Sequence, residues 1–517
     1  MRRRDFLKAL PIGMLCAQGC SSVGRVALKG KRPNILLIMS DDMGFSDMGC
    51  YGGEIETPNL DGLANNGLRF TEFYGTGRCW PTRATLMSGR YSDRLTSNQV
   101  TIAELLKTVG YQTSMAGKWH LSKTATENGP IQRGFDSYYG TLTGAGSYWL
   151  PPTLTRNTKA VKPDSPDYYY TEKIGDEAVK QIHGFAKSPK PFFQYVAFTA
   201  PHWPLHAREE VIQKYLKRYR EGWNVLRQQR YQRMIEIGLI DKQRWPLPAL
   251  EPVVEDWDTV DHKDWRIRNM AVYAAMVDHM DQAIGRIIGA LKDTGCLDDT
   301  LIIFTNDNGA CSEHLSGNAW STANNVLDWA KSQGKTISVG DNMDIDSGGP
   351  LTFHSVGRNW ANAQNTPLRR YKANVHEGGA CVPCIMYWTR GLKHSGGSIT
   401  NQRGHMVDIL STCIELAGAS YPADFNGNSI DANEGTNLVN VIKGGKQDPQ
   451  RVYYFNHQGT HAVIKGDWKI VREGGKKGKW YLYNLTRGKT ELTDYAERMP
   501  EKVKELAALW DARFASE

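Results

Sequence analysis

Hydrophobic positions follow two patterns that alternate along most of the chain. Short apolar runs of strand length end in polar residues, and stretches with helical patterns lie between them. Four such runs are Asn34–Met39, Tyr111–Ala116, Phe192–Phe198 and Thr300–Thr305. Strand-length runs that alternate with helical patterns are typical of a sheet of parallel strands covered by helices. The pattern therefore predicts an α/β fold.

The stretches between these runs predict further elements. Residues 209–237 place apolar side chains at helical spacing with basic side chains around them, and a solvated basic face accounts for these better than a polyanion-binding surface. The run from Met270 to Leu291 predicts an amphipathic helix. Residues 310–362 are rich in Gly, Asn and Ser with little periodicity, which predicts a long loop region near the site.

Beyond Gly444 the pattern changes to short strands separated by glycine turns. The predicted strands are Val452–Asn456, His461–Lys465, Trp468–Val471 and Trp480–Asn484, followed by a helix over Pro500–Phe514. We therefore place a main domain at residues 31–444 and a small C-terminal subdomain, an antiparallel sheet with a helix, at residues 445–517.

The first 19 residues have the layout of an export signal. Basic residues precede a short apolar run that ends in small residues, and Arg3–Lys8 fits the twin-arginine pattern R-R-x-F-L-K. The run is well short of the ~20 apolar residues that a spanning helix needs. Cys20 follows a loose match to a bacterial lipoprotein cleavage site, which leaves lipid attachment there open. The sequence predicts an exported bacterial protein, periplasmic or held to the envelope, with a lipid anchor as its one route to a membrane.

Composition and charge exclude several other classes. With 40% hydrophobic and 23% charged residues, the chain is neither disordered nor fibrous. The net charge of +8 falls to +5 without residues 1–19, and no concentrated basic stripe accompanies it, so nucleic acid is not an expected partner. The nine cysteines are scattered, and the lone Cys381–Cys384 pair lacks the second ligand pair of a zinc site. We expect most of them to be buried thiols or isolated bridges.

Polar residues follow each of the four predicted strands. They are Asp41 and Asp42, Lys118 and His120, His202, and Asp307 and Asn308. Because sites in open α/β sheets gather at the carboxyl ends of the strands, these residues outline a metal-and-anion site. The carboxylate and amide oxygens of Asp41, Asp42, Asp307 and Asn308 suit Ca²⁺, with Mg²⁺ as the alternative, rather than zinc.

The segment around Cys79 resembles a known family signature. Residues 77–90 read GRCWPTRATLMSGR, and Cys79-x-Pro81-x-Arg83 followed by a helical turn and Gly-Arg resembles the sulfatase signature. Residues 110–120, GYQTSMAGKWH, resemble the second signature of that family. Further matches at 57–61, 201–202, 307–309, 366–372 and 377–379 extend the resemblance from residue 32 to about residue 441. The departures from the commonest residues are Arg78, Trp80, Thr82 and Ser88, and they bear on the efficiency of maturation rather than on identity.

Pro81 adds a physical reason for the position of Cys79. Proline suits the first position of a helix, which would place Cys79 at a helix N-terminus. Free N–H groups there favour anions such as a sulfate group.

The resemblance implies a large mixed, mostly parallel sheet of the alkaline phosphatase type and a sulfuric ester hydrolase. In that family a maturation enzyme oxidises the cysteine, here Cys79, to formylglycine, and one hydroxyl of the hydrated aldehyde attacks sulfur. The implied roles are as follows: Arg83 holds the hydrate, Lys118 and Lys372 bind sulfate oxygens, His202 with Lys372 protonates the leaving oxygen, His120 takes the proton from the second hydroxyl, and Asp307 accepts a proton. The implied metal ligands are Asp41, Asp42, Asp307, Asn308 and position 79.

The implied substrate is a sulfated small molecule or carbohydrate, either an aryl or a sugar sulfate. Two alternatives remain open. One is a phosphonate or phosphate ester hydrolase of the same superfamily, which shares the fold. The other is a non-catalytic exported sugar-binding protein, against which the complete set of site residues counts.

Overall fold

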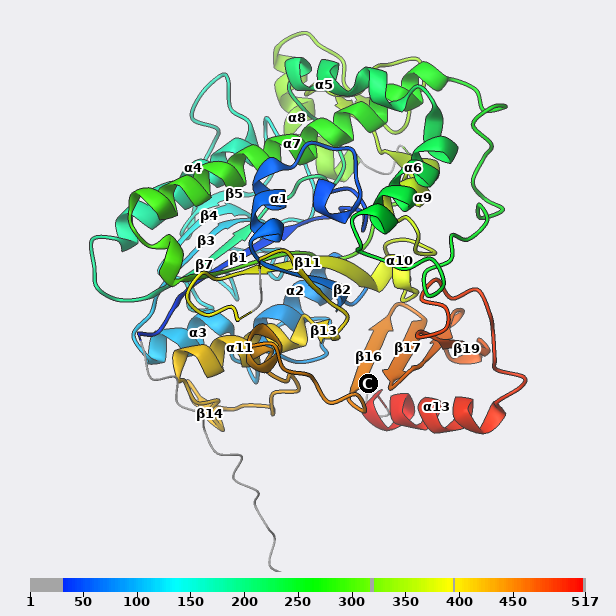
Figure 1. The fold of residues 1–517 in the computed structure, drawn as a ribbon. Coiled ribbons are helices and arrows are strands. Elements are labelled where there is room, and N and C mark those ends of the chain that lie inside the picture. Colours follow the sequence, from blue (N-terminus) through cyan, green and yellow to red (C-terminus); the bar gives the residue numbers. More distant parts are fainter. Residues whose placement is uncertain (1–30, 317–319, 394–395, 515–517) are drawn as a thin grey trace, which may run out of the picture. The chain divides into compact units, whose positions relative to one another are not determined.

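A mixed, mostly parallel sheet forms the centre of the molecule, as the sequence predicted (Figure 1). The computed structural model describes residues 31–316, 320–393 and 396–514, so the predicted export signal and Cys20 lie outside the described residues. The strands of this sheet are β1 (Asn34–Ser40), β2 (Leu68–Tyr74), β3 (Gln112–Gly117), β4 (Ser137–Thr141), β5 (Leu154–Arg156), β6 (Lys159–Ala160), β7 (Phe192–Ala197), β8 (Thr300–Asn306), β11 (Cys381–Tyr387), β12 (Ser398–Thr400) and β13 (Gly404–His405). Their order is β12-β2-β11-β8-β1-β7-β3-β4-β5-β6, with β13 beside β2.

The four strands predicted from the sequence lie together in the parallel centre of the sheet. β1 pairs in parallel with both β7 and β8, so Ile35 lies between Phe193 and Leu301, and β3 pairs in parallel with β7. β11 runs antiparallel between β2 and β8, which makes the sheet mixed. Because β1, β3, β7 and β8 point the same way, the polar residues that follow them emerge at one edge.

Helices cover both faces of the sheet (Figure 1). One face carries α1 (Pro58–Asn65), α4 (Tyr170–Phe185) and α7 (Lys263–Asp293), and the other carries α2 (Cys79–Ser88), α3 (Ile102–Thr108) and α11 (Val407–Ala417). Successive residues of β1 enter different cores: Ile38 packs on the side of α4 and α7, and Leu37 on the side of α3 and α11. The helix predicted over Met270–Leu291 is confirmed, and α7 begins seven residues earlier and ends two residues later.

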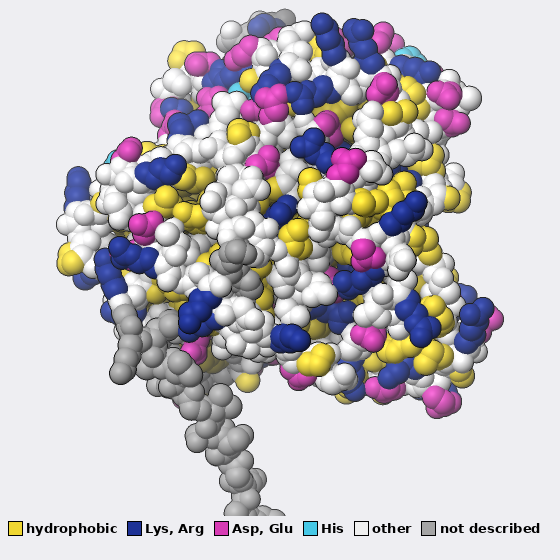
Figure 2. Space-filling model, viewed as in Figure 1, with side chains coloured by type: hydrophobic (Ala, Val, Ile, Leu, Met, Phe, Trp, Pro, Cys, Tyr) yellow, Lys and Arg dark blue, Asp and Glu magenta, His cyan; other side chains and the backbone are white. Residues whose placement is uncertain are grey.

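The surface and the helices are consistent with the composition. On the face drawn in Figure 2, Lys and Arg side chains are interspersed with Asp and Glu rather than gathered in a stripe. Among the described residues, none of the helices combines the length and the apolar character needed to cross a membrane.

A second, small sheet lies near the C-terminus. It consists of β16 (Val452–His457), β17 (Thr460–Lys465), β18 (Trp468–Arg472) and β19 (Trp480–Asn484), antiparallel in that order, with α13 (Pro500–Phe514) packed on it. Each predicted strand is confirmed to within a residue, as is the helix. Both sheets belong to one compact unit that begins at Arg32. The domain boundary at residue 444 stays a prediction. Other short elements of the fold include α10 (Glu377–Ala380), α12 (Val439–Ile442), β14 (Asp424–Phe425) and β15 (Asn428–Ser429).

The prediction of one helix with a solvated basic face over 209–237 is wrong in two respects. The segment is divided into α5 (Glu209–Tyr215), the 3₁₀ turn η2 (Leu216–Tyr219) and α6 (Gly222–Glu236). Gly222 has φ +77° and lies so close to the Trp257 ring that a Cβ would be 2.1 Å from it, so the chain breaks at this residue. Arg230 is buried, because it pairs with Asp47 at 2.6 Å and with Glu54 at 2.7 Å.

The prediction of a long loop over 310–362 is also wrong. This stretch contains α8 (Trp320–Ser332), β9 (Ser338–Val339), β10 (Thr352–Phe353) and α9 (Gly357–Gln364). The apolar positions of α8, Ala323, Val326 and Ala330, do follow a helical spacing, and they pack in a small core with Phe353. The polar residues between them concealed that spacing.

Candidate active site

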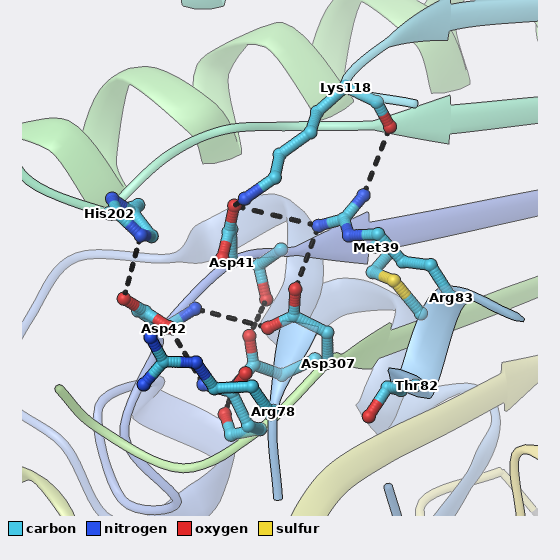
Figure 3. Close-up of polar contacts among 12 residues, drawn as sticks. Met39, Asp41, Asp42, Arg78, Thr82, Arg83, Lys118, His202 and Asp307 are labelled. Carbon is cyan, nitrogen blue, oxygen red and sulfur yellow. Dashed lines mark hydrogen bonds and ion pairs between the residues drawn. The ribbon is translucent and has the colours of Figure 1, made fainter. Parts of the chain in front are cut away.

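The structure brings the predicted acidic residues together at the carboxyl ends of β1 and β8 (Figure 3). The backbone N–H of Asp42 donates to Oδ1 of Asp307 at 3.3 Å, and Nδ2 of Asn308 donates to Oδ1 of Asp42 at 2.7 Å. Asp41, Asp42, Asp307 and Asn308 are all buried. Burying charged carboxylates is costly unless cations lie nearby, so the cluster requires positive partners.

Arg83 and Lys118 supply two of these partners. Nη2 of Arg83 donates to Oδ2 of Asp307 at 2.8 Å and lies 3.6 Å from Oδ2 of Asp41, while the Lys118 ammonium pairs with the same Asp41 oxygen (Figure 3). Arg83 is further held by the carbonyl oxygen of Lys118 at 3.1 Å and the hydroxyl of Tyr195 at 3.4 Å. Burial and the neighbouring Asp307 carboxylate raise the pKa of Asp41 to about 6.

Lys372 supplies the third cation. Its Nζ donates to Oδ2 of Asp42 at 2.7 Å and lies 3.2 Å from Nε2 of His202. Burial disfavours the charged form of Asp42, but the charge of Lys372 outweighs it and lowers the pKa of this carboxyl. Burial likewise disfavours the Lys372 ammonium, and Asp42 more than offsets it, so the pKa of Lys372 is raised. The pair is ionised as a unit.

Cys79 is the first residue of α2 and is only 3% exposed. The N–H of Thr82 donates to the carbonyl of Arg78 at 3.1 Å, which is the first hydrogen bond of the helix. Pro81 is therefore the third helical residue, and the prediction that it would be the first is wrong. Proline fits there because the N–H groups of a first helical turn have no partner within the helix. The N-terminal position expected for Cys79 is therefore found. Burial raises the pKa of the thiol, and the charges of Lys118 and Lys372 oppose that rise.

The donor atoms fit a hard divalent cation. Two sets of donor atoms are close together: carboxylate oxygens of Asp41 and Asp42 with a ring nitrogen of His202, and carboxylate oxygens of Asp41 and Asp307 with the sulfur of Cys79. Within each set the atoms lie within 4.8 Å of one another. Oδ1 of Asp41 and Oδ1 of Asn308 are buried, and neither has a hydrogen-bond partner among the described residues. Buried oxygens without donors are what Ca²⁺ or Mg²⁺ would satisfy.

The two predicted histidines occupy different sides of the cluster. Nε2 of His202 lies 3.4 Å from Oδ2 of Asp42, and Nδ1 lies 2.7 Å from the carbonyl oxygen of Trp203. Burial and the Lys372 charge lower the pKa of His202. His120 has φ +61°, and its ring packs where a Cβ on Gly144 would come within 2.5 Å of it. Burial and the Lys118 charge lower the pKa of His120, so both rings are neutral near pH 7.

The sequence did not predict Glu313 as a site residue. Its carboxylate accepts from Nη1 of Arg78 at 2.9 Å and from Nε1 of Trp203 at 2.8 Å, and lies 3.8 Å from Nζ of Lys372. Burial opposes its ionisation, but the Lys372 charge outweighs burial and lowers the pKa of Glu313 to about 2. Its side chain is 33% exposed and that of Arg78 is 23% exposed, so this pair is the exposed edge of the otherwise buried cluster around Lys372. In the sequence, Arg78 stands out only as a departure from the commonest residue of the family signature.

The cysteines of the described residues are all free thiols. Cys311 lies in the site, with its sulfur 3.9 Å from Nζ of Lys372. The sequence left open whether some cysteines form isolated disulfide bridges, and the described residues contain none.

Comparisons with known proteins agree with this geometry. The family described as Sulfatase matches residues 33–419. An uncharacterized sulfatase of Schizosaccharomyces pombe is 33% identical over 530 residues that cover 93% of each chain, and an arylsulfatase of Klebsiella aerogenes is 31% identical over 79% of this chain and 91% of its own. A crystal structure of Ps i-CgsB in complex with k-i-k-neocarrahexaose superposes with a TM-score of 0.64 at 25% identity, covering 92% of this chain and 91% of the other.

Proposed function

The chain belongs to the sulfatase family and is a sulfuric ester hydrolase, and we propose that it removes sulfate from a carbohydrate through a formylglycine made from Cys79. One observation carries this proposal. Three buried carboxylates and three buried cations surround a thiol at a helix N-terminus, which is an arrangement for an anionic substrate and a cation together.

We assign a divalent cation, Ca²⁺ or alternatively Mg²⁺, to Asp41, Asp42, Asp307 and Asn308, beside position 79. The two unpartnered oxygens of this set support the assignment. When bound, such a cation supplies positive charge that acidifies the attacking hydroxyl and polarises a sulfate oxygen.

The chain's own residues perform the remaining tasks. Arg83 lies within the cluster and holds the group at position 79, with Asp307 as proton acceptor at 2.8 Å from the guanidinium. Lys118 and Lys372 are placed to bind sulfate oxygens, and the free N–H groups at the start of α2 add to that positive field.

Proton transfer is divided between the histidines. The raised pKa of Lys372 means that its amine is protonated before the reaction, and its Nζ lies 3.2 Å from Nε2 of His202. The two residues together can therefore protonate the leaving oxygen. His120 has the opposite task. Its lowered pKa keeps it neutral, and its buried Nδ1 has no partner among the described residues, which suits a base that takes the proton from the second hydroxyl of the hydrate.

A carbohydrate sulfate is the substrate class we favour. The solved relative that binds neocarrahexaose matches over nearly the whole chain, and other relatives are N-acetylgalactosamine-6-sulfatases, 26% identical in the human protein. An aryl sulfate would serve as an artificial substrate, because its leaving group needs less protonation.

Two measurements test the proposal. Peptide mass spectrometry of active protein should find position 79 lighter than cysteine by the thiol-to-aldehyde change, and Cys79→Ala should abolish turnover while the protein stays folded. Initial rates on nitrophenyl sulfate should exceed those on nitrophenyl phenylphosphonate. Full activity with unmodified Cys79 would overturn the mechanism, and faster phosphonate hydrolysis would assign the chain to the phosphonate branch of the superfamily.

We also propose that the protein is exported to the periplasm or envelope. The support is the twin-arginine pattern at residues 3–8. Cell fractionation of the bacterial host, with Arg3→Lys and Arg4→Lys as the comparison, tests export, and mass analysis of residue 20 tests lipid attachment.

A further inference from the structure

Glu313 joins the segment that carries Cys79 to the segment that carries His202. Its Oε1 accepts from Nη1 of Arg78 at 2.9 Å, and its Oε2 accepts from Nε1 of Trp203 at 2.8 Å. Arg78 directly precedes Cys79 in the chain. On the other side, Trp203 directly follows His202. One carboxylate, in the loop after β8, therefore connects the neighbour of the nucleophile position to the neighbour of the leaving-group acid.

The His202 ring depends on Trp203 for its orientation. Nδ1 of His202 lies 2.7 Å from the carbonyl oxygen of Trp203, and because a carbonyl oxygen can only accept, Nδ1 carries the hydrogen of this bond. The two rings also pack together, with their centroids 4.8 Å apart. With Nδ1 held in this way, Nε2 is directed towards Nζ of Lys372, which is 3.2 Å away. A shift of Trp203 would therefore move the atom through which His202 exchanges its proton.

Glu313 fixes the indole of Trp203. An indole N–H can only donate, and a partly buried indole normally has an acceptor, which the Glu313 carboxylate provides. The other oxygen of this carboxylate is held by Arg78, whose guanidinium lies 5.4 Å from the centroid of the Trp80 ring. Because hydrogen bonds on both oxygens define the orientation of a carboxylate, these contacts form a continuous chain from the start of α2 to the His202 ring.

The distance from Glu313 to Lys372 favours an action through Trp203 over a direct one. Oε2 of Glu313 lies 3.8 Å from Nζ of Lys372, which is beyond hydrogen-bond distance, whereas Oδ2 of Asp42 lies 2.7 Å from the same Nζ. Lys372 therefore has a charge partner without Glu313. The contacts of Glu313 with Arg78 and Trp203, both at 2.9 Å or less, are the closer ones.

We propose that Glu313 is a positioning residue for proton transfer to the leaving oxygen. It fixes Trp203, and Trp203 in turn holds the His202 ring where His202 and Lys372 protonate the departing group. The inference rests on the proposed function, in which these two residues supply that proton, and it adds a residue that the family resemblance did not include. Loss of Glu313 should therefore harm the esters whose leaving groups need a proton most.

The test compares matured wild-type protein with variants on nitrophenyl sulfate and on the sulfates of galactose and N-acetylgalactosamine, which have poorer leaving groups. Glu313→Ala should lower the ratio of kcat for the sugar sulfates to kcat for nitrophenyl sulfate by about tenfold, since a misplaced general acid loses part of its effect. Trp203→Phe removes the indole N–H and keeps an aromatic ring beside His202, and it should lower the same ratio by about three- to tenfold. Glu313→Gln retains an acceptor oxygen for Trp203 and should lower the ratio less than Glu313→Ala. Glu177→Ala on α4 is the matched control, because Glu177 also holds an arginine, Arg156, at 2.7 and 3.1 Å; it should keep the wild-type ratio.

The outcomes separate positioning from a charge effect and from the function on which it rests. If Glu313 acted only through its charge on Lys372, Glu313→Gln would be as harmful as Glu313→Ala and Trp203→Phe would behave as the wild type, which would overturn the inference. An equal loss on all esters in Glu313→Ala would indicate a general structural role and would also overturn it. If Glu313→Ala does not fold, Glu313→Gln and Trp203→Phe decide the question in the same way. A wild-type ratio in His202→Ala would instead refute His202 as the acid, and the positioning role with it.

Discussion

A buried network of charges joins the small sheet to the large one, and Glu377 lies at its centre. Oε1 of Glu377 accepts from Nζ of Lys469 on β18 at 2.7 Å, and Oε2 pairs with the Lys489 ammonium and accepts from the Tyr74 hydroxyl on β2 at 3.1 Å. All of these side chains are buried. Glu377→Gln keeps the shape of the side chain and removes the negative charge that two ammonium groups share, so we expect it to destabilise the fold.

The magnitude follows from the pKa of Glu377. Burial would raise it, but Lys469 and Lys489 outweigh burial and lower it from 4.5 to about 2. Since one pKa unit corresponds to 1.36 kcal/mol, ionised Glu377 contributes about 3 kcal/mol to the free energy of unfolding at pH 7. The folded-state pKa is the lower one, so this contribution is present above pH 4.5 and is lost as the pH falls towards 2.

Urea unfolding followed by tryptophan fluorescence measures the effect. At pH 7 the variant should be less stable than the wild type by about 3 kcal/mol, and the difference should stay nearly constant down to about pH 5 and then shrink as the pH is lowered towards 2. Glu505→Gln on α13 is the control, because Glu505 pairs at the surface with Lys465 at 3.0 Å and Lys502 at 2.6 Å. That control should change stability by no more than about 0.5 kcal/mol. A Glu377→Gln effect as small as the control, or one independent of pH, would refute the reasoning.

Three further predictions concern the active site. His202→Ala should slow hydrolysis of sugar sulfates far more than hydrolysis of nitrophenyl sulfate. His120→Ala should slow hydrolysis of both substrates and accumulate a sulfated residue 79 after a burst of phenol. Equal leaving-group sensitivity in the two variants, with no trapped adduct, would refute the assignment of different proton transfers to the two histidines. Chelation should abolish activity, and added Ca²⁺ should restore it. Calorimetry should show weaker Ca²⁺ binding by Asn308→Ala. One equivalent of tightly held zinc in active protein would contradict the assignment of Ca²⁺ to this site. Gly144→Ala adds a Cβ that would lie 2.5 Å from the His120 ring and would displace it. Because a small misplacement of a catalytic group slows the reaction, kcat should fall by about tenfold or more with little change in melting temperature. An unaltered kcat would show that the ring has room to move.

The centre of the fold could be predicted because its strands are local in sequence and their pairing is constrained. Asn34–Met39 and Thr300–Thr305 each end in acidic residues, and parallel neighbours must present those ends at one edge. The direct pairing of β1 with β8 then brings Asp42 and Asp307 into contact. No knowledge of the loops was needed for this part of the site.

The remainder depends on contacts between distant loops that have no periodic signal. Lys372 was expected only through the family resemblance, and its position is fixed by packing: a Cβ on Gly309 would lie 1.7 Å from the carbonyl oxygen of Gly378, so the loop after β8 lies against the segment that carries Lys372. Glu313 lies in the stretch predicted to be irregular, and Arg230 was expected on a solvated face. In both cases a tertiary ion partner, and not the local pattern, decides where the charge lies.

The charge balance of the cluster gives a physical reason for its composition. Asp41, Asp42 and Asp307 carry three negative charges against three positive charges on Arg83, Lys118 and Lys372, and both histidines are neutral near pH 7. On the proposed function, a bound divalent cation leaves two positive charges in excess, and an anionic sulfate ester offsets only one of them. The remaining charge lies beside position 79, where it stabilises negative charge on the attacking oxygen while Asp307, within the same cluster, takes the proton. The site is therefore electrostatically complementary to the reacting state rather than to the bound substrate, which is the condition for faster chemistry rather than tighter binding alone.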